Sequence, residues 1–507
     1  MLIENLRKFA KTDKIAVYSG DVFLTYKDLY ERSKALAFKI KDTYQTDKPV
    51  GIYGEKETDI IVSIVAAVVA KKTYVILPDN YPIERLQYIL KDCDADLLIN
   101  VSKHNFDETN LNTIYSKDID ELVNEYKDRV DDFDDNYNLD NLALILYTSG
   151  STGNPKGVEI TYKNIKMYID SCNDSYQQFK ELVQEDVRSL GMSSYGFALS
   201  LAFYGILNTG NVWYNPPQEV TRDLRFFFEY LKKVQPHSFS ITPSIAVKLM
   251  ENQDFNDKVL NKTASICLGG EPLFKEVAIQ MNERFPNKVY NGYGSSESTS
   301  FGGGCLINED SINKSESIMP VNHMVYDQYC TLIDKDNHEI MDDDVNGEIL
   351  IFGDSIAKGY HNLPELTNKK FITFNGEPAF KTGDLAYKKN GFLFLVGRSD
   401  NQVKIGGNRI EIEDVEAHLN QCSIVKESAV GVNTNNKDVN SLVGLIVLKE
   451  EYKNLKQLDC FLTIKKEMLR KVEGYKVPQK LLFVEELPRT ANGKLDRTKI
   501  KETCNER

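Results

Sequence analysis

The sequence lacks any apolar run long enough to cross a membrane, and its N-terminus lacks the apolar core of a signal peptide. The longest apolar stretch, residues 60–70, falls short of the roughly 18 residues that a membrane span needs, and Ser63 interrupts it. Residues 1–14 carry charges throughout, which is not typical of a signal peptide. We therefore expect neither export nor a membrane partner.

Paired cysteines at metal-ligand spacing are also absent. The chain has eight cysteines, all scattered, and none forms a Cys-x-x-Cys pair. That distribution favours neither a zinc site nor a disulfide framework. Isolated cysteines fit a reducing compartment, so the sequence predicts a cytoplasmic protein. No repeat of fixed period is present either.

What is present is an ordinary globular composition. The 507 residues are 41% hydrophobic and 27% charged, which is not typical of disordered or fibrous chains. That length suggests about two to four domain-sized units. The formal net charge of −13 argues against binding a phosphate backbone as the main task, so no nucleic-acid partner is expected.

The apolar pattern predicts alternating helices and strands along the first part of the chain. Residues 24–44 and 58–70 have helical spacing, whereas residues 49–53, 74–77 and 142–147 look like buried strands. This alternation is typical of a layered α/β architecture. Between them, the acidic residues 107–140 are predicted to form a solvated surface segment.

A second pattern begins near residues 397–400 and runs for about 105 residues, which is the length of a small domain. Its expected elements are strands at 403–405, 428–432 and 441–447, and helices at 412–419 and 458–469. They predict a small separate α+β domain. Its last part, residues 465–507, is basic, with twelve Lys or Arg against seven Asp or Glu.

A loop rich in glycine and hydroxyl groups follows the predicted strand 142–147. Glycines let backbone N–H groups approach an anion closely, and hydroxyls add further donors. We therefore expect this loop to bind the phosphates of a nucleotide, although a flexible polar turn is the alternative. It is not a Walker loop. Its candidate residues are Thr148, Ser149, Gly150, Ser151, Thr152, Gly153 and Lys156.

Four further motifs lie downstream of this loop. In residues 291–297, Tyr293 stands between two glycines and could lie flat against a base, and Glu297 could hold a hard metal ion. In residues 381–384, Asp384 follows a glycine and could accept both hydroxyls of a ribose. The last two are residues 397–411 and residues 488–494, which end on Lys494. Each motif alone could be an ordinary turn.

Together and in this order, the motifs resemble the adenylate-forming superfamily of acyl-CoA synthetases, luciferases and nonribosomal-peptide-synthetase adenylation domains. The resemblance spans the chain, including residues 24–29 and 77–85, and it is greatest to D-alanine–carrier protein ligases. It implies a large N-terminal layered α/β domain, residues 1–399, and a small mobile C-terminal α+β domain, residues 400–507. The implied hinge is Asp400.

The resemblance implies an enzyme that uses ATP and Mg²⁺ in two half-reactions. A carboxylate attacks the α-phosphate of ATP to give an acyl-adenylate and pyrophosphate, and a thiol then displaces AMP. The first half-reaction requires positioning and charge neutralisation. Lys494 would contact the substrate carboxylate and the α-phosphate, and Glu297, with Thr148, would hold Mg²⁺. In the second half-reaction, a domain rotation would move Lys494 away and bring residues 404–409 towards the site.

The resemblance also implies a nucleotide pocket. Tyr293 would stack on adenine, and Asp384 would bind the ribose with help from Arg398. The remaining residues of this pocket are Gly270, Glu271, Pro272, Asn291, Gly292, Gly294 and Ser296.

The expected acid pocket departs from that of the α-amino acid activators. Those enzymes bind the substrate ammonium with an aspartate that follows an aromatic residue, whereas here Gly196 follows Tyr195. Because a buried ammonium without a counter-charge is costly, we expect an aryl, hydroxy or short acyl acid. A shift of one or two residues in register is the alternative. The other pocket positions, none of them charged, are Phe197, Ser200, Ser240, Cys267, Gly269, Gly292, Ser300 and Phe301.

Three hypotheses about function stay open. The first is a free-standing acid–carrier protein ligase, whose acceptor is the phosphopantetheine thiol of a separate acyl or peptidyl carrier protein. The second is an acyl-CoA synthetase that uses coenzyme A instead. The third is an inactive binding or scaffold protein, against which Lys494, Glu297 and Asp384 argue. An amino acid ligase with an atypical pocket is a variant of the first.

Overall fold

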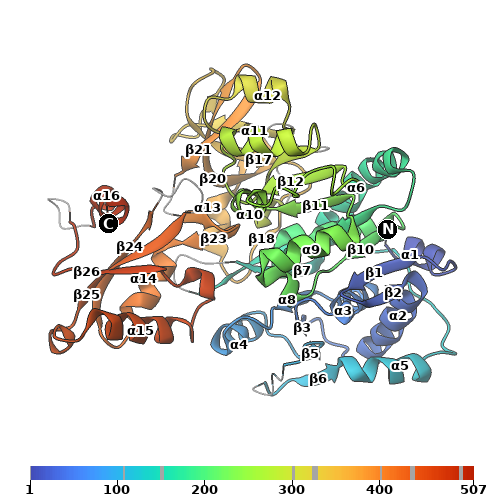
Figure 1. The fold of residues 1–507 in the computed structure, drawn as a ribbon. Coiled ribbons are helices and arrows are strands. Elements are labelled where there is room, and N and C mark those ends of the chain that lie inside the picture. The colour runs from blue at the N-terminus through green and yellow to red at the C-terminus, as the bar shows by residue number, and fades with distance from the viewer. Residues whose placement is uncertain are drawn as a thin grey trace. The chain divides into compact units, whose positions relative to one another are not determined.

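The computed structural model of the chain describes residues 2–104, 106, 109–148, 154–299, 303–321, 329–399, 402–433, 440–489 and 495–506. These residues form two compact units. Unit 1 contains Met1–Asp79, Leu90–Tyr147 and Gly157–Gly397, and unit 2 contains Asn80–Ile89, Thr148–Lys156 and Arg398–Arg507 (Figure 1). The predicted boundary between residues 399 and 400 stays a prediction, because Asp400 lies outside the described residues.

The first sheet of unit 1 accounts for the buried strands that the sequence predicted. In spatial order its strands are β18 (Gly359–Tyr360), β8 (Lys156–Thr161), β7 (Leu142–Thr148), β4 (Tyr74–Leu77), β3 (Val50–Tyr53), β5 (Leu97–Asn100) and β6 (Asn112–Tyr115). Strands β3, β4 and β5 are buried along their whole length. Strand pairs β3–β4, β3–β5 and β5–β6 are parallel, as expected for a sheet covered on both faces.

Helices pack against this sheet through one large apolar cluster that includes α2 (Tyr26–Thr43), α3 (Thr58–Val69) and α6 (Tyr162–Val183). Helix α2 begins at a capping box in which Thr25 and Asp28 satisfy each other's backbone N–H groups. All residues of α3 except the first are buried, which explains its apolar sequence. The other helices of this part of unit 1 are α1 (Ile3–Phe9), α5 (Ile119–Glu125) and α7 (Ala202–Asn208). Most of α4 (Ile83–Asp92) belongs to unit 2.

A second sheet carries several of the predicted pocket residues. Its strands, in order, are β14 (Gly303–Leu306), β13 (Val289–Tyr293), β12 (Ser265–Gly269), β11 (Ser238–Ile241), β9 (Arg188–Leu190), β10 (Val212–Tyr214), β1 (Ile15–Ser19) and β2 (Val22–Thr25). A second apolar cluster packs helices against it. The helices of this part of the chain are α8 (Gln218–Arg222), α9 (Leu224–Val234), α10 (Pro243–Met250), α11 (Lys275–Arg284) and α12 (Glu309–Lys314).

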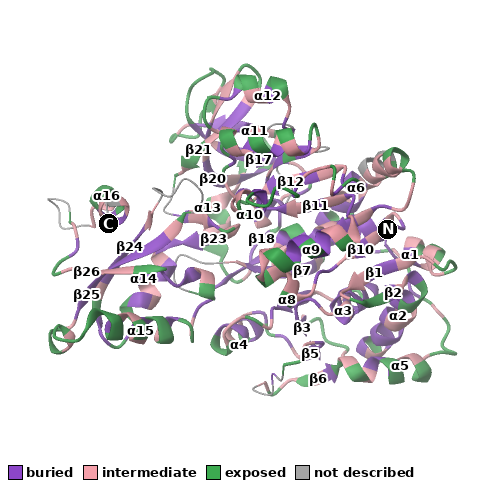
Figure 2. Cartoon of the chain, in the orientation of Figure 1, coloured by how far each residue is buried: buried purple, intermediate pink, exposed green. Residues whose placement is uncertain are grey.

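A third, antiparallel sheet completes unit 1. Its strands are β16 (Glu339–Ile340), β15 (Tyr329–Ile333), β17 (Gly347–Phe352), β20 (Glu377–Lys389) and β19 (Phe371–Phe374), with β21 (Phe392–Arg398) paired to β20. Helix α13 (Pro364–Lys370) precedes β19. Figure 2 shows exposed residues on α11, α12 and α13, so these helices have one face in solvent.

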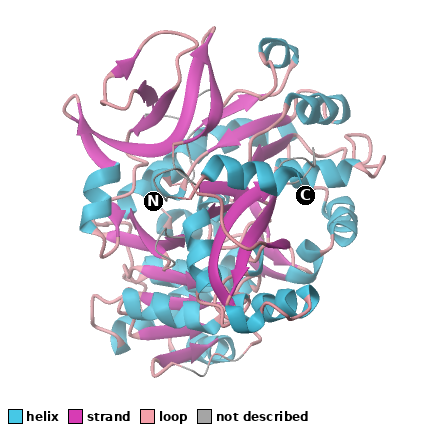
Figure 3. Cartoon of the chain, turned by 90° about the vertical axis from the view of Figure 1, so that its left-hand side faces the viewer, coloured by secondary structure: helices cyan, strands magenta, loops and turns pink. Residues whose placement is uncertain are grey.

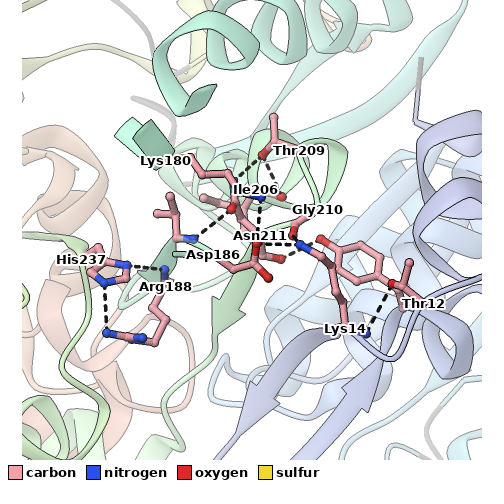
Figure 4. A network of polar contacts seen from close by, with 12 residues as sticks. Thr12, Lys14, Lys180, Asp186, Arg188, Ile206, Thr209, Gly210, Asn211 and His237 are labelled. Carbon is pink, nitrogen blue, oxygen red and sulfur yellow. Dashed lines mark hydrogen bonds and ion pairs between the residues drawn. The ribbon is translucent and has the colours of Figure 1, made fainter. Parts of the chain in front are cut away.

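A polar network joins the start of the chain to the middle of the second sheet (Figure 4). The amine of Lys14 donates to Asp186, 2.6 Å away, and Lys180 lies 2.8 Å from the same carboxylate oxygen. Beside them, the side-chain oxygen of Asn211 accepts from the N–H of Val187 at 2.9 Å. These bonds connect segments that lie far apart in sequence, so this part of the sheet depends on long-range contacts.

Unit 2 has its own core around the sheet β24 (Val425–Asn433), β25 (Ser441–Leu448) and β26 (Lys480–Phe483). Figure 1 shows β24 beside β25, which pair antiparallel, and Figure 3 shows the helices and strands of the chain from a second side. One apolar cluster joins this sheet to α14 (Ile412–Asn420) and α15 (Gln457–Met468), and another joins it to α16 (Arg497–Glu506). A two-stranded ribbon, β22 (Gln402–Ile405) with β23 (Asn408–Glu411), precedes α14.

The predicted fold class is confirmed, with a large N-terminal domain and a small C-terminal one. Most described residues of the acidic segment 107–140 are exposed or half-buried, as predicted for a surface segment, but some pack into the core. That stretch contains β6 and α5, and Phe133 is buried in the core. Asp131 forms an ion pair with Arg7 at 3.1 Å, so one of the acidic side chains of this segment makes a tertiary contact. Within the described ranges, no helix is both long and apolar enough to cross a membrane.

Candidate functional site

Asp384 lies at a β-bulge in β20. The pairing of β17 with β20 shifts register between Glu348 and Leu350, opposite the Gly383–Asp384 turn of the strand. Gly383 has a φ of +80°, which other residues rarely adopt, and its N–H donates to Glu348 at 2.8 Å. Bulges of this kind change the direction in which a side chain points. Here the bulge sets the direction of the buried side chain of Asp384.

Tyr293, at the end of β13, meets this carboxylate. Its hydroxyl donates to Asp384 over 2.6 Å, and both side chains are buried. The two residues are 91 positions apart in sequence and come from different sheets. The fold thus joins two of the predicted nucleotide-binding motifs directly.

Glu297 is completely buried in a single turn of helix that follows β13. Its carboxylate accepts a hydrogen bond of 2.8 Å from the hydroxyl of Tyr360 on β18. Its backbone carbonyl accepts from the N–H of Ala357, and Thr299 donates to the carbonyl of Ser355 at 2.6 Å. The segment 355–360 therefore holds Glu297 in place, although the sequence analysis assigned it no role.

Neighbouring strands β11, β12 and β13 form a floor of small side chains. Ser240 pairs with Cys267, and Gly269 pairs with Gly292. A Cβ added at Gly292 would lie 2.6 Å from the sulfur of Cys267, so this position must stay glycine unless the sulfur moves. Burial raises the pKa of the Cys267 thiol to about 11, so the thiol stays protonated at neutral pH.

The edges of this floor are held by hydrogen bonds. Asn291 donates to the carbonyl of Pro320 at 2.8 Å, and Glu271 accepts from the first N–H groups of α10, at Ser244, over 3.1 Å. Carboxylates are favoured at helix N-termini. Between them, Gly270 has a φ of +85°. These positions are thus fixed by the surrounding backbone.

The loop after β9 carries the predicted acid-recognition residues. The amine of Lys56 donates to the carbonyls of Gly191, Met192 and Ser193, the last at 2.7 Å. The hydroxyl of Tyr195 accepts from Trp213 at 2.8 Å. Farther along, Ser200 donates to the carbonyl of Phe197 at 2.8 Å, so its hydroxyl is engaged locally. The loop is therefore tied down by buried bonds.

Two residues of unit 2 belong to the predicted phosphate loop. The side-chain oxygen of Thr148 is buried and has no hydrogen-bond partner in the described part of the chain. A buried oxygen without a hydrogen-bond partner costs free energy unless a ligand supplies that partner. The amine of Lys156 lies 3.7 Å from Glu411, and both side chains are buried.

Comparisons with known proteins bear on the whole chain. Residues 5–361 match the family model described as AMP-binding enzyme, and residues 414–494 match the AMP-binding enzyme C-terminal domain. This chain belongs to the AMP-binding enzyme family. It is an AMP-forming ligase of the adenylate-forming superfamily, as the motifs predicted.

Individual proteins resemble this chain over nearly its whole length. A D-alanine–D-alanyl carrier protein ligase from Bacillus licheniformis is 32% identical over 514 residues, which cover 99% of each chain. Two solved structures share the fold, each at 22% identity and a TM-score of 0.81. The o-succinylbenzoate CoA synthetase of Bacillus subtilis covers 98% of both chains. A nonribosomal peptide synthetase protein with adenylation and PCP domains covers 98% of this chain and 83% of its own.

The residues predicted for the nucleotide pocket of this AMP-binding enzyme are thus partly assembled. Tyr293 contacts Asp384, whereas Asn291, Gly292, Gly294 and Ser296 lie along or just after β13. Gly270, Glu271 and Pro272 follow β12, and Arg398 ends β21. Their roles stay predictions. The predicted residues outside the described ranges are Ser149, Gly150, Ser151, Thr152, Gly153, Ser300, Phe301, Asp400 and Lys494.

The sequence analysis missed Tyr360 and Glu55. Tyr360 contacts Glu297, and Glu55 accepts a hydrogen bond of 2.8 Å from Ser194, two residues before Gly196. Neither residue lies in a recognisable motif. Glu55 is a glutamate just after a buried strand, which is a signal too common to select it from sequence.

Proposed function

We propose that this enzyme activates a carboxylic acid as its acyl-adenylate and transfers the acyl group to the phosphopantetheine thiol of a separate carrier protein. The observation that carries the proposal is the buried Tyr293–Asp384 pair, in which an aromatic ring and a carboxylate converge from two sheets. A ring that can lie against a base, next to a carboxylate that can accept ribose hydroxyls, suits a nucleoside.

In the first half-reaction, the chain would position ATP and neutralise its charge. Tyr293 would lie against the adenine, Asp384 would accept from the ribose with help from Arg398, and the loop Thr148–Lys156 would donate to the β- and γ-phosphates. Lys494 would contact the attacking carboxylate and the α-phosphate, where negative charge develops. Because Lys156 lies 3.7 Å from Glu411, its release from that carboxylate would accompany phosphate binding.

The donor set fits a magnesium ion. Within the described ranges, no three His, Cys, Asp or Glu side chains gather where they could hold a metal ion together. Mg²⁺ commonly binds one or two protein oxygens together with substrate phosphates. Glu297 and the orphaned oxygen of Thr148 would supply such oxygens. Bound Mg²⁺ would neutralise charge on the phosphates.

A carrier protein is the acceptor that the relatives favour. Curated relatives that match 98% of this chain are D-alanine–D-alanyl carrier protein ligases. Carrier proteins are acidic as a rule, and residues 465–507 are basic. We propose that the small domain, residues 400–507, turns about Asp400 between the two half-reactions, so that Lys494 serves only the first. Coenzyme A is the alternative acceptor.

The proposed substrate is a carboxylic acid other than an ordinary α-amino acid, because Gly196 offers no carboxylate to an α-ammonium. The uncharged pocket positions favour an aryl, hydroxy or short acyl acid. An amino acid ligase with an atypical pocket is the second candidate, and the ligase relatives favour it.

A pyrophosphate-release panel of aryl, hydroxy, fatty and amino acids tests this proposal. We expect release with one acid class outside the α-amino acids, followed by transfer to a carrier protein rather than to coenzyme A. Strong selectivity for an α-amino acid would overturn the substrate assignment. A lack of release with every acid would overturn the proposed reaction.

A further inference from the structure

A buried carboxylate lies behind the loop that carries Gly196. Glu55 is 4% exposed and follows β3, which places it in unit 1 with that loop. Its carboxylate accepts a hydrogen bond of 2.8 Å from the hydroxyl of Ser194. The same hydroxyl accepts from the N–H of Gly196 at 3.1 Å. Glu55 is thus linked to Gly196 through one side chain.

The carboxylate of Glu55 has spare acceptor capacity. A carboxylate can accept about four hydrogen bonds, and among the described residues Ser194 is the one side chain that donates to it. The nearest amine, Lys56, donates to three backbone carbonyls instead. Because a buried carboxylate with so few donors is costly, a ligand that supplies donors would bind here favourably.

The local charges favour a cation. Glu57 and Asp79 act on Glu55 with the same sign of charge, and Lys56 is the opposing group. Two further carboxylates therefore add to the negative charge at Glu55, and the amine of Lys56, which opposes it, is engaged with backbone carbonyls. An ammonium group brought by the substrate would reduce this imbalance.

The position of Glu55 is rigid. The side chain of Glu57 accepts from the N–H groups of Glu55 and Lys56 at 3.0 and 3.1 Å. The carbonyl of Lys56 accepts from Ser19 at 2.6 Å and from Asn215 at 2.8 Å. Rigid support of this kind is typical of a residue that selects a ligand.

Gly196 itself leaves little room for an aspartate. A Cβ added there would lie 3.0 Å from the ring of Pro78 and 3.5 Å from the hydroxyl of Ser194. An aspartate would therefore require Pro78 to shift by a few tenths of an ångström.

We propose that Glu55 is a specificity-determining residue whose carboxylate binds an ammonium group that the substrate acid carries beyond its α-carbon. The inference rests on the proposed acid activation. Among acids other than α-amino acids, it favours β- or γ-amino acids, whose ammonium lies one or two carbons farther from the carboxylate, over the aryl, hydroxy and short acyl acids. Uncharged aryl or acyl acids lack the group that Glu55 would bind.

The test compares acids of matched length in pyrophosphate release. Wild-type enzyme is assayed with β-alanine and γ-aminobutyrate, with propionate and butyrate, and with D- and L-alanine. We expect the β- or γ-amino acid to have the highest kcat/KM. Glu55→Gln should lower that value about 100-fold through KM, as expected for loss of a buried charge partner, and should leave the kcat/KM of propionate and butyrate within a few-fold. Glu121→Gln, an exposed change on α5, is the matched control.

The outcomes separate this inference from the proposed function. Equal losses for all acids in Glu55→Gln would mean that Glu55 only supports the Ser194 loop, and a wild-type preference for uncharged acids would also overturn the inference. Release with none of the acids in any panel would overturn the proposed function too.

A pH profile of the wild-type enzyme gives a test that needs no variant. Burial raises the pKa of Glu55 above its ordinary value. The charge of Lys56 and the hydrogen bond from Ser194 lower this pKa, whereas the charges of Asp79 and Glu57 raise it further. Protonated Glu55 would no longer attract an ammonium. KM for the β- or γ-amino acid should therefore rise on acidification at pH values that are still above the ordinary titration range of a glutamate. A parallel rise for propionate would contradict the assignment.

Discussion

The hydroxyl of Tyr360 donates a hydrogen bond of 2.8 Å to Glu297, 63 residues away in sequence. Glu297 is fully buried, so this bond fixes a carboxylate that water cannot reach easily. A buried carboxylate is suited to hold a cation, because its charge is costly to bury without a counter-charge. The proposed magnesium site therefore depends on a residue outside every recognised motif.

Tyr360→Phe should raise KM for MgATP by about 10-fold, because a hydrogen bond to a charged group is worth about 1.5–3 kcal/mol. Steady-state pyrophosphate release at varied MgATP measures it, with circular dichroism to check the fold. Tyr115→Phe, on an exposed tyrosine, is the control. An unchanged KM for MgATP in Tyr360→Phe would show that the bond does not support the metal site.

Lys494→Ala should slow adenylation far more than it slows thioester formation from pre-formed adenylate. The reason is that the domain rotation proposed for the second half-reaction would move Lys494 away from the site, so Lys494 would neutralise charge at the α-phosphate in the first step alone. Single-turnover assays of each half-reaction measure the two rates, and Lys499→Ala, an exposed lysine nearby in sequence, is the control. Equal losses in both half-reactions would refute the assigned role.

Gly292→Ala should lower the free energy of unfolding by about 1–3 kcal/mol, as overpacking does in a close-packed interior. The added methyl would lie 2.6 Å from the sulfur of Cys267. The double variant Gly292→Ala with Cys267→Ala should recover much of the loss, because the sulfur is gone. Urea unfolding of the four proteins gives the coupling energy, and strictly additive losses would contradict the contact.

The pair of His361 with Glu159 should make stability depend on pH. Their side chains lie 2.8 Å apart, and the bond with Glu159 raises the pKa of His361 above its ordinary value. The folded state therefore holds the proton more tightly than the unfolded state. The stabilisation is fully present below the unfolded pKa of about 6.5 and disappears as pH rises through the raised value.

Urea unfolding of wild type and His361→Gln from pH 5.5 to 8 measures this contribution. Both side chains are partly exposed, so we expect a difference of about 1 kcal/mol or less. Burial lowers the pKa of His237, which acts in the opposite direction, but this effect is common to both proteins and cancels. A difference between them that is constant with pH would contradict the expectation.

Local patterns predicted most secondary structure well. Residues 58–70 were predicted as a helix and form α3, Thr58–Val69, because an apolar run of that length is typical of a buried helix and longer than most strands. The strand prediction at 428–432 was too short, since β24 runs from Val425 to Asn433. Its extra residues include Lys426 and Glu427, whose charges hide the strand from an apolar pattern.

The acidic segment shows where sequence patterns fail. Asp131 is one of several near-consecutive aspartates, yet it binds Arg7, 124 residues away. Nothing local separates it from Asp132, which is exposed. Runs of charged residues are exposed on average, but a single member can be partly buried when a residue distant in sequence forms an ion pair with it.

By itself, the sequence determined the family, the layered α/β class and the motif residues, because glycines, hydroxyls and apolar periods act over a few neighbouring residues. Only the tertiary structure decided which side chains meet. Tyr293 contacts Asp384 across 91 positions, and Ser194 contacts Glu55 across 139. Such contacts arise when sheets pack together, and hydrogen bonds between distant segments leave no periodic trace along the chain.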